Sequence, residues 1–517
     1  MKYFVIFILS FFVLSGFTQD TTFNKILTSF SGSSSINSII KSNNSYYCLV
    51  AHRDTPNVFV YNYGIIRINN NFKTIDSSKY SIQQPVIINN GHGFDINKQD
   101  TSFIMAGAVQ FFGNSKENGY LIKFNKDLDT LWTKQIAHPD TAYADTAATP
   151  WVTLRDVKVT PSGDYLILGN YNHHCQGNRN RAFIIKMDGG GGIIWYKFLD
   201  INMHPSFITS FELEPLDTGF YVTTRISAIS YLYHYDKACN YKWATAFNTQ
   251  TYSLHTNDII LYNNDIYITS TYFIPPIVNS STSLLVISKL NRQTHTLIWE
   301  RTYPYISIYS KWLRQETIDI EISPNGNIAI GTVGKKYTGT DFTGDIRANL
   351  LMLNSNGDSL WSHYYTYRND SAEVEDMQFN DMVICDDGGI LFGGNYYNFR
   401  ESMFLRAWLV KTDSLGNAPG MFTVGIEENN TLVLKRQKPL LYPNPATSNF
   451  NLRFEQSPTV DYELSIYSVS GRLVKQQQLT AFGNEYRVDI QEMKVGVYFV
   501  RLESDGEVVY SGKFIKK

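Results

Sequence analysis

The chain has 517 residues, which is too long for one ordinary hydrophobic core, so either several domains or an array of repeats is expected. Its formal net charge is −2 and charged residues make up only 18 % of it, which argues against a nucleic-acid binder because such a protein needs a basic surface. Aromatic residues reach 15 % of the chain. Together with many Asn, Ser, Thr and Ile residues, this composition predicts an all-β protein.

The first 19 residues have the pattern of a secretory signal peptide. Lys2 precedes an unbroken apolar run from Tyr3 to Leu14, and small and polar residues follow. This run is too short for a membrane-spanning helix, which needs roughly 20 apolar residues. We therefore expect residues 1–19 to be a signal peptide and the mature chain to have no transmembrane segment.

A short signature recurs along most of the chain. An apolar strand ends in a residue that is usually basic, then an apolar residue and an Asn or Asp that opens a turn, and in the middle five copies a Trp follows seven or eight residues later. The spacings between copies are 56, 63, 48, 55, 63 and 59 residues, as expected of solenoids and propellers. The seven copies begin at Arg67, Lys123, Lys186, His234, Lys289, Met352 and Lys411.

Each copy is preceded by a second predicted hairpin, most clearly at Arg155 and at Glu316, where the turns are Pro-Ser-Gly and Pro-Asn-Gly. Two hairpins per repeat give four antiparallel strands, which is the composition of a propeller blade. The fold class predicted is therefore all-β, with a seven-bladed β-propeller over residues 20–425.

The last repeat lacks the outer strand that contains Leu-Trp in the others. The segment Phe23–Thr28 has the aromatic, Lys and apolar spacing of the strand that begins at Leu131, and it directly precedes the first repeat. We therefore expect this N-terminal strand to complete the seventh blade and close the ring.

Residues 426–438 are polar and charged and are interpreted as a linker, and residues 439–517 form a second unit. Three segments of that unit alternate apolar and polar residues, as strands with one buried face do: they start at Asn449, Tyr462 and Gly496. A small C-terminal β-sandwich is expected.

This unit resembles a known family, the type A C-terminal sorting domain of the type IX secretion system of Bacteroidetes. The residues that carry the resemblance are Tyr442, Pro443, Asn444, Pro445, Gly471, Gly496 and Tyr498. The resemblance implies that the type IX secretion machinery is a partner. It also implies export across the outer membrane, followed by release or attachment at the cell surface.

Two clusters have residues that can bind metals, and for each a non-metal interpretation is favoured. His173-His174-Cys175 lies in a polar loop without the further ligands that a structural zinc site needs. Asn125, Asp127 and Asp129 resemble the start of a calcium loop, but its later Gly and acid are missing, so we expect turn capping instead. We predict no metal, no cofactor and no catalytic residue.

Three other features leave alternatives open. Paired acids such as Asp319 with Glu321 and Glu373 with Glu375 suit glycosidase chemistry, but nothing in the sequence links them to one pocket. The basic residues at the strand ends either form an anion-binding ring on one rim or simply face solvent. The four cysteines, Cys48, Cys175, Cys239 and Cys385, are few for an exported chain, so we expect them to be unpaired.

Two functions follow as hypotheses. The favoured one is a non-enzymatic surface or secreted protein that binds a glycan or a protein through one face of the propeller. The alternative is an extracellular polysaccharide hydrolase or lyase that uses acids in the central channel. Acids converging at the centre with a basic residue favour the enzyme, whereas a neutral aromatic face favours binding.

Overall fold

The computed structural model describes residues 22–517, apart from the internal segments given at the end of this paragraph. The chain divides into two compact units, Met1–Ile426 and Glu427–Lys517. Residues 1–19, the expected signal peptide, lie outside the described residues. The other segments outside them are 30–31, 54–61, 81–85, 112–116, 138–150, 174–178, 200–206, 216–217, 227–228, 248–253, 275–281, 304–318, 336–345, 368–374, 399–403, 423–438, 455–461, 470–471, 481–484 and 505–506.

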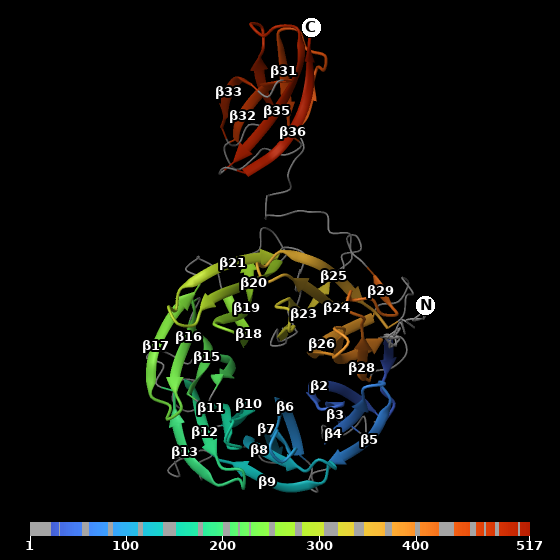
Figure 1. Ribbon diagram of the computed structural model, residues 1–517, viewed down its shortest axis with the longest axis vertical. Helices are drawn as coiled ribbons and strands as arrows, with labels where there is room; N and C mark the ends of the chain where they lie inside the picture. Colours follow the sequence, from blue (N-terminus) through green and yellow to red (C-terminus); the bar gives the residue numbers. More distant parts are fainter. Residues whose placement is uncertain are drawn as a thin grey trace, which may run out of the picture. The chain divides into compact units, whose positions relative to one another are not determined.

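The first unit is a β-propeller with seven blades, each made of four antiparallel strands (Figure 1). The predicted fold class is therefore confirmed. The strands of the first four blades are β2 Ser33–Ser42, β3 Ser45–Arg53, β4 Asn62–Asn69 and β5 Thr74–Tyr80; β6 Val86–Ile96, β7 Phe103–Phe111, β8 Glu117–Phe124 and β9 Thr130–Ile136; β10 Trp151–Val159, β11 Tyr165–His173, β12 Arg179–Met187 and β13 Ile193–Phe198; β14 Phe207–Leu213, β15 Gly219–Ile226, β16 Ile229–Asp236 and β17 Tyr241–Phe247.

The seventh blade takes its outermost strand from the beginning of the chain, since β1 pairs antiparallel with β28. Blades six and seven are also joined by one parallel contact between Ile346 and Asp376, and β29 (Met421–Phe422) pairs with β25. The strands of the last three blades are β18 Leu254–Tyr262, β19 Asp265–Ile274, β20 Thr282–Asn291 and β21 Leu297–Tyr303; β22 Asp319–Ile322, β23 Ile328–Lys335, β24 Ile346–Leu353 and β25 Ser359–Tyr365; β26 Glu375–Ile384, β27 Ile390–Asn398, β28 Arg406–Lys411 and β1 Phe23–Ile26.

The recurring Asn or Asp of the signature forms the turn between the third and fourth strands. In the second blade, Asn125 Oδ1 accepts the backbone N–H groups of Asp127 at 2.9 Å and Asp129 at 2.8 Å. The same geometry recurs at Asp188, Asp236, Asn354 and Asp413. The interpretation of Asn125, Asp127 and Asp129 as a capped turn is confirmed, because Asn125 caps the turn and also donates from its side chain to the Asp129 carboxylate at 3.2 Å.

The basic residues of the signature neither form an anion-binding ring nor face solvent, so both sequence-based interpretations are wrong. Five of the six reach an acid in the first hairpin of their own blade, and Arg67 instead donates to the Ser45 hydroxyl at 3.3 Å. The Lys411 side chain is fully buried beside Asp387 at 2.7 Å. Burial of the hydrocarbon stem and pairing of the ammonium group explain this position. The other pairs are Lys123–Asp100, Lys186–Asp164, His234–Glu214 and Lys289–Asp265.

The aromatic side chain of the outer strand packs against the outer turn of the next blade. Trp361 of the sixth blade lies over Gly416, and Tyr365 donates a hydrogen bond to the Gly416 carbonyl at 2.7 Å. In the closing strand Phe23 takes the place of the Trp and packs on Phe72, with ring centroids 5.6 Å apart. Neighbouring blades are therefore joined by one repeated contact around the ring.

Gly416→Ala is expected to cost about 1–3 kcal/mol more than Gly388→Ala. Both glycines have a positive φ, near 80°, so the backbone strain of an added Cβ is similar. At Gly416, however, that Cβ would lie 2.6 Å from His363 and 2.7 Å from Trp361, whereas at Gly388 the nearest contact is 3.5 Å from Ser414. Chemical unfolding of the two variants checks this difference, and equal losses would mean that the contact between blades six and seven is loose.

The second unit consists of two sheets packed face to face. One contains β30 Leu440–Tyr442, β31 Asn449–Arg453 and β34 Glu485–Asp489, in that order. The other has the order β33 Leu473–Leu479, β32 Tyr462–Ser468, β35 Gly496–Ser504 and β36 Glu507–Lys516. Phe450, Leu464, Val500 and Phe514 are completely or almost completely buried between them, which is the core of a small β-sandwich.

Candidate functional site

The centre of the propeller is enclosed by the first strand of every blade (Figure 1). Consecutive first strands contact one another all the way round, in the order β2, β6, β10, β14, β18, β22, β26 and back to β2. Side chains alternate along a strand, and here one set is buried between blades while the other is half-buried and faces the channel. The channel is therefore lined by alternate residues of seven strands.

Strand pairing places these residues at two levels. In six blades the register shifts just before the first level, and such an irregularity turns a side chain in a new direction. The first level consists of Ser38, Gly93, Asp156, Ser210, Asp258, Asp319 and Asp381, and the second, two residues further on, of Ile40, Asp95, Lys158, Glu212, Ile260, Glu321 and Val383. Seven carboxyl groups and one ammonium group thus share the channel.

Several of these carboxyl groups hold adjacent blades together. Asp381 accepts the backbone N–H of Ile39 in the first blade at 2.6 Å, and Asp319 accepts that of Met382 in the seventh at 2.7 Å. Such bonds satisfy N–H groups at the inner edge of each sheet that the strand pairing leaves free. Asp95 likewise accepts the backbone N–H of Val159 at 2.7 Å, and Asp258 accepts a hydrogen bond from the Ser210 hydroxyl at 2.7 Å.

The one cation among the described residues at these two levels is shared among several acids. Lys158 Nζ lies 3.2 Å from Glu212, and both side chains keep about a third of their exposure or less, 32 % and 26 %. Burial by itself lowers the pKa of Lys158, but the carboxylates of Glu212, Asp156 and Asp95 outweigh it and hold that pKa well above its ordinary value. Lys158 is therefore charged throughout the physiological range.

The pKa values of several channel acids are raised above those of ordinary surface carboxyl groups. Burial raises the pKa of Asp156 to about 7, and burial together with repulsion from Asp381 and Asp258 raises the pKa of Glu321 to about 8. The pKa of Asp319 also lies well above its ordinary value, because the group is buried and hydrogen-bonded to Asp381. At neutral pH the channel therefore holds protonated and ionised carboxyl groups side by side.

The sequence paired Asp319 with Glu321, and the structure brings both into this channel with acids of five other blades. Glu373 lies outside the described residues, and so do His174 and Cys175. Where the chain is described, no group of three or more His, Cys, Asp or Glu side chains has the geometry to hold a metal ion. The channel is thus an acidic, partly protonated site rather than a recognisable metal centre.

Two of the cysteines are buried thiols. Burial raises the pKa of Cys48 to about 12 and that of Cys385 to about 11. Cys239 is also buried, in an outer turn, and Cys175 lies outside the described residues. High pKa values make Cys48 and Cys385 poor nucleophiles, so neither is a candidate catalytic residue.

In the C-terminal unit, the first group of motif residues connects the two ends of the domain. Asn444 donates to the Lys513 carbonyl at 3.0 Å and accepts the N–H of Ile515 at 3.0 Å. Pro443 and Pro445 flank it and are exposed. These bonds hold the N-terminal segment of the domain against its last strand, β36.

The remaining motif residues have structural contacts where they are described. Tyr442 donates to Glu485 at 2.6 Å, and the buried Tyr498 donates to the Lys494 carbonyl at 2.8 Å. Gly496 begins β35, and Gly471 lies outside the described residues. The motif thus includes residues that stabilise the sandwich.

The architecture defines the class: an all-β protein with a seven-bladed propeller and a small β-sandwich. Residues 440–517 match the family described as secretion system C-terminal sorting domain. The C-terminal unit is therefore a sorting domain of the type IX secretion system, and it directs export to the cell surface or the extracellular space. No helix of the described residues is long and apolar enough to cross a membrane.

Similar solved structures share the fold at low identity. They include the Dos1 propeller (9 % identity, 77 % of this chain and 95 % of that one, TM-score 0.40) and the NanB sialidase from Streptococcus pneumoniae (10 %, 76 % and 70 %, 0.39). A protein of unknown function from Dyadobacter fermentans is also similar (10 %, 63 % and 97 %, 0.40). No curated protein matches the chain.

Proposed function

We propose that this protein is a secreted or cell-surface binding module of a Bacteroidetes cell. In this proposal, residues 1–19 direct it through the inner membrane, the sorting domain takes it across the outer membrane, and the propeller then binds a glycan or a protein. The type IX machinery is its partner in export.

The observation that carries the proposal is the difference between the two faces of the propeller. Antiparallel strands place the turns between first and second strands and between third and fourth strands on one face, and all other connections on the opposite face. On the first face the turns are short, and those between third and fourth strands are capped alike by Asn or Asp. On the opposite face the number of residues between consecutive described strands differs widely, from two between β15 and β16 to fifteen between β21 and β22.

Variation between blades on one face suits recognition, because connections carry specificity while the blades hold them in place. The channel acids support the same interpretation. The oxygens of Asp95, Asp319 and Asp381 accept backbone N–H groups of neighbouring blades, so these carboxyl groups are already used to close the ring.

The test is an array of glycans and polysaccharides probed with the mature full-length chain and read for both binding and cleavage. Replacing residues 304–313, which precede the predicted hairpin at Glu316, by the same number of Gly and Ser residues is expected to abolish or change binding without a large change in melting temperature. A matched control replaces Ser355 and Asn356 by Ala. These residues lie in a short turn of the first face, between β24 and β25, and the control is expected to leave binding unchanged. Silence in both readouts would overturn the proposal.

A second function, that of a polysaccharide hydrolase or lyase, is favoured by one specific observation. Glu321, whose pKa is raised to about 8 by burial and by nearby acids, holds a proton at neutral pH in the same channel as Glu212, which pairs with Lys158. A protonated and an ionised carboxyl group are the two roles that glycosidases need. Cleavage on the array that Glu321→Gln and Glu212→Gln both abolish would establish this function.

A further inference from the structure

One end of the sorting domain has apolar side chains on both faces of the same sheet. Beneath the sheet lies the core, whereas on the outer surface Val497 is 39 % exposed, Phe499 47 % and Ile515 43 %. Strand pairing makes them neighbours, because Val497 is opposite Ile515 and Phe499 is opposite Tyr467. We call Tyr467, Val469, Val497, Phe499 and Ile515 the outer apolar face.

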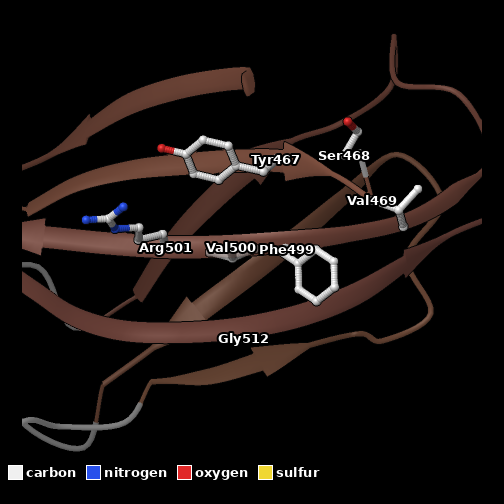
Figure 2. Close-up of a pocket in the computed structure, with 7 residues that line it drawn as sticks. All are labelled: Tyr467, Ser468, Val469, Phe499, Val500, Arg501 and Gly512. Atoms are coloured by element: carbon white, nitrogen blue, oxygen red, sulfur yellow. The ribbon is translucent and has the colours of Figure 1, made fainter. Parts of the chain in front are cut away.

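This face has a hollow. Figure 2 shows Tyr467 and Phe499 on adjacent strands, with Val469 at one end and Arg501 at the other. The hollow has a volume of about 410 Å³ and is also lined by Gly512 on the neighbouring strand.

The charged residues around the face are not evenly distributed. Arg501 is paired with Glu503 at the far end. At the apolar end Lys513 is paired with Phe499, Lys517 follows Ile515 by two residues, Lys494 precedes β35 by two, and all three lysines are exposed. A surface that is apolar at the centre and positive at its rim complements a partner with protruding aliphatic or aromatic side chains and nearby carboxylates.

We propose that the outer apolar face is the surface by which the type IX export machinery binds this sorting domain. Soluble domains of this size leave few contiguous apolar patches exposed, and such a patch marks an interaction site. The occupant is a protein of the machinery, because a sorting domain has to be recognised in order to direct export. The aromatic or aliphatic group of that protein enters the hollow, and its carboxylates face Lys513 and the neighbouring lysines. This inference rests on the proposed export route.

The test uses the full-length chain produced in a bacterium with a working type IX system. Phe499→Glu places a charge at the centre of the face and is expected to reduce the exported fraction about tenfold or more, with the protein retained in the periplasm. Lys513→Glu reverses a rim charge while keeping the apolar area, and a smaller reduction of several-fold is expected. The matched control is Leu440→Glu, because Leu440 is 62 % exposed but belongs to the other sheet.

The outcomes distinguish binding by the export machinery from misfolding, from dimer formation and from failure of the proposed export route. Melting temperatures of the purified variants show whether they fold, and the proposal requires folded Phe499→Glu protein that is retained. Equal export of Phe499→Glu and the parent chain would overturn the proposal, and so would retention of folded Leu440→Glu. A dimer of the parent chain that Phe499→Glu dissociates, without an export defect, would also overturn it in favour of a second copy. A chain ending at residue 439 is expected to stay in the periplasm, and its export would instead overturn the proposed export route.

Discussion

Removal of residues 20–28 from the mature chain is expected to lower the melting temperature by more than about 10 °C, or to prevent folding altogether. The strand β1 pairs along its whole length with β28, so its loss leaves an open sheet edge in the seventh blade. It also uncovers Trp408, whose Nε1 donates to Asn24 Oδ1 at 2.6 Å. Differential scanning calorimetry of the mature chain and the truncated chain measures the effect.

A point change should give a graded version of this result. Asn24 also donates to the carbonyl groups of Thr366 at 2.6 Å and Pro419 at 2.8 Å, so Asn24→Ala removes three hydrogen bonds and is expected to cost about 2–4 kcal/mol. Asn356→Ala, in an exposed outer turn, is the control and should cost little. An unchanged melting temperature in the truncated chain would contradict the closure of the ring by this strand.

The fold class was predictable because one signature is repeated. Its Asn or Asp has a local role, capping a turn within five residues, so it stays recognisable in sequences that otherwise differ. The same logic applies to the closing strand, where Lys25 donates to the Phe72 carbonyl as Lys134 donates to that of Gly191 in the next blade. Local chemistry and an even period were sufficient to predict seven blades.

The channel was not predictable as a site, because its acids come from six separate blades. A signal was present, since Asp156, Asp258, Asp319 and Asp381 each stand four residues before the residue that opens the first turn. Aligning the whole strands requires knowledge of the bulges, which shift the register by one residue before Asp156, Asp258 and Asp381. The partners of the basic residues were missed for a similar reason, since Lys411 meets Asp387 only when β28 pairs with β27 and so comes beside the turn between β26 and β27.

The outer apolar face of the sorting domain was missed for a different reason. In β35 the exposed Val497 and Phe499 alternate with the buried Tyr498 and Val500. Alternation of apolar residues normally separates a core face from a polar one, but here both sets are apolar. The sequence pattern therefore indicates a strand without telling which side is the core.

Glu321→Gln is expected to stabilise the propeller at pH 8 and to flatten the pH dependence of its stability. The pKa of Glu321 is about 8 in the folded protein and has its ordinary value, near 4.5, when unfolded. Between these values the folded state keeps a proton that the unfolded state has released. The contribution of Glu321 to the free energy of unfolding is therefore highest below pH 4.5 and falls as the pH rises to 8. One pKa unit corresponds to about 1.4 kcal/mol, and partial access of water to the channel reduces the total to about 1–3 kcal/mol.

Thermal unfolding at pH 5 and at pH 8 checks this prediction. The parent chain should lose several degrees of melting temperature between the two values, and Glu321→Gln should lose distinctly less. Asp358→Asn is the control, because its hydrogen bond to Asn354 lowers the pKa of that exposed carboxyl group and it is ionised in both states across the window. If Glu321→Gln kept the full pH dependence, the protonated carboxyl group would not be at Glu321, and the case for Glu321 as an acid catalyst would fail with it.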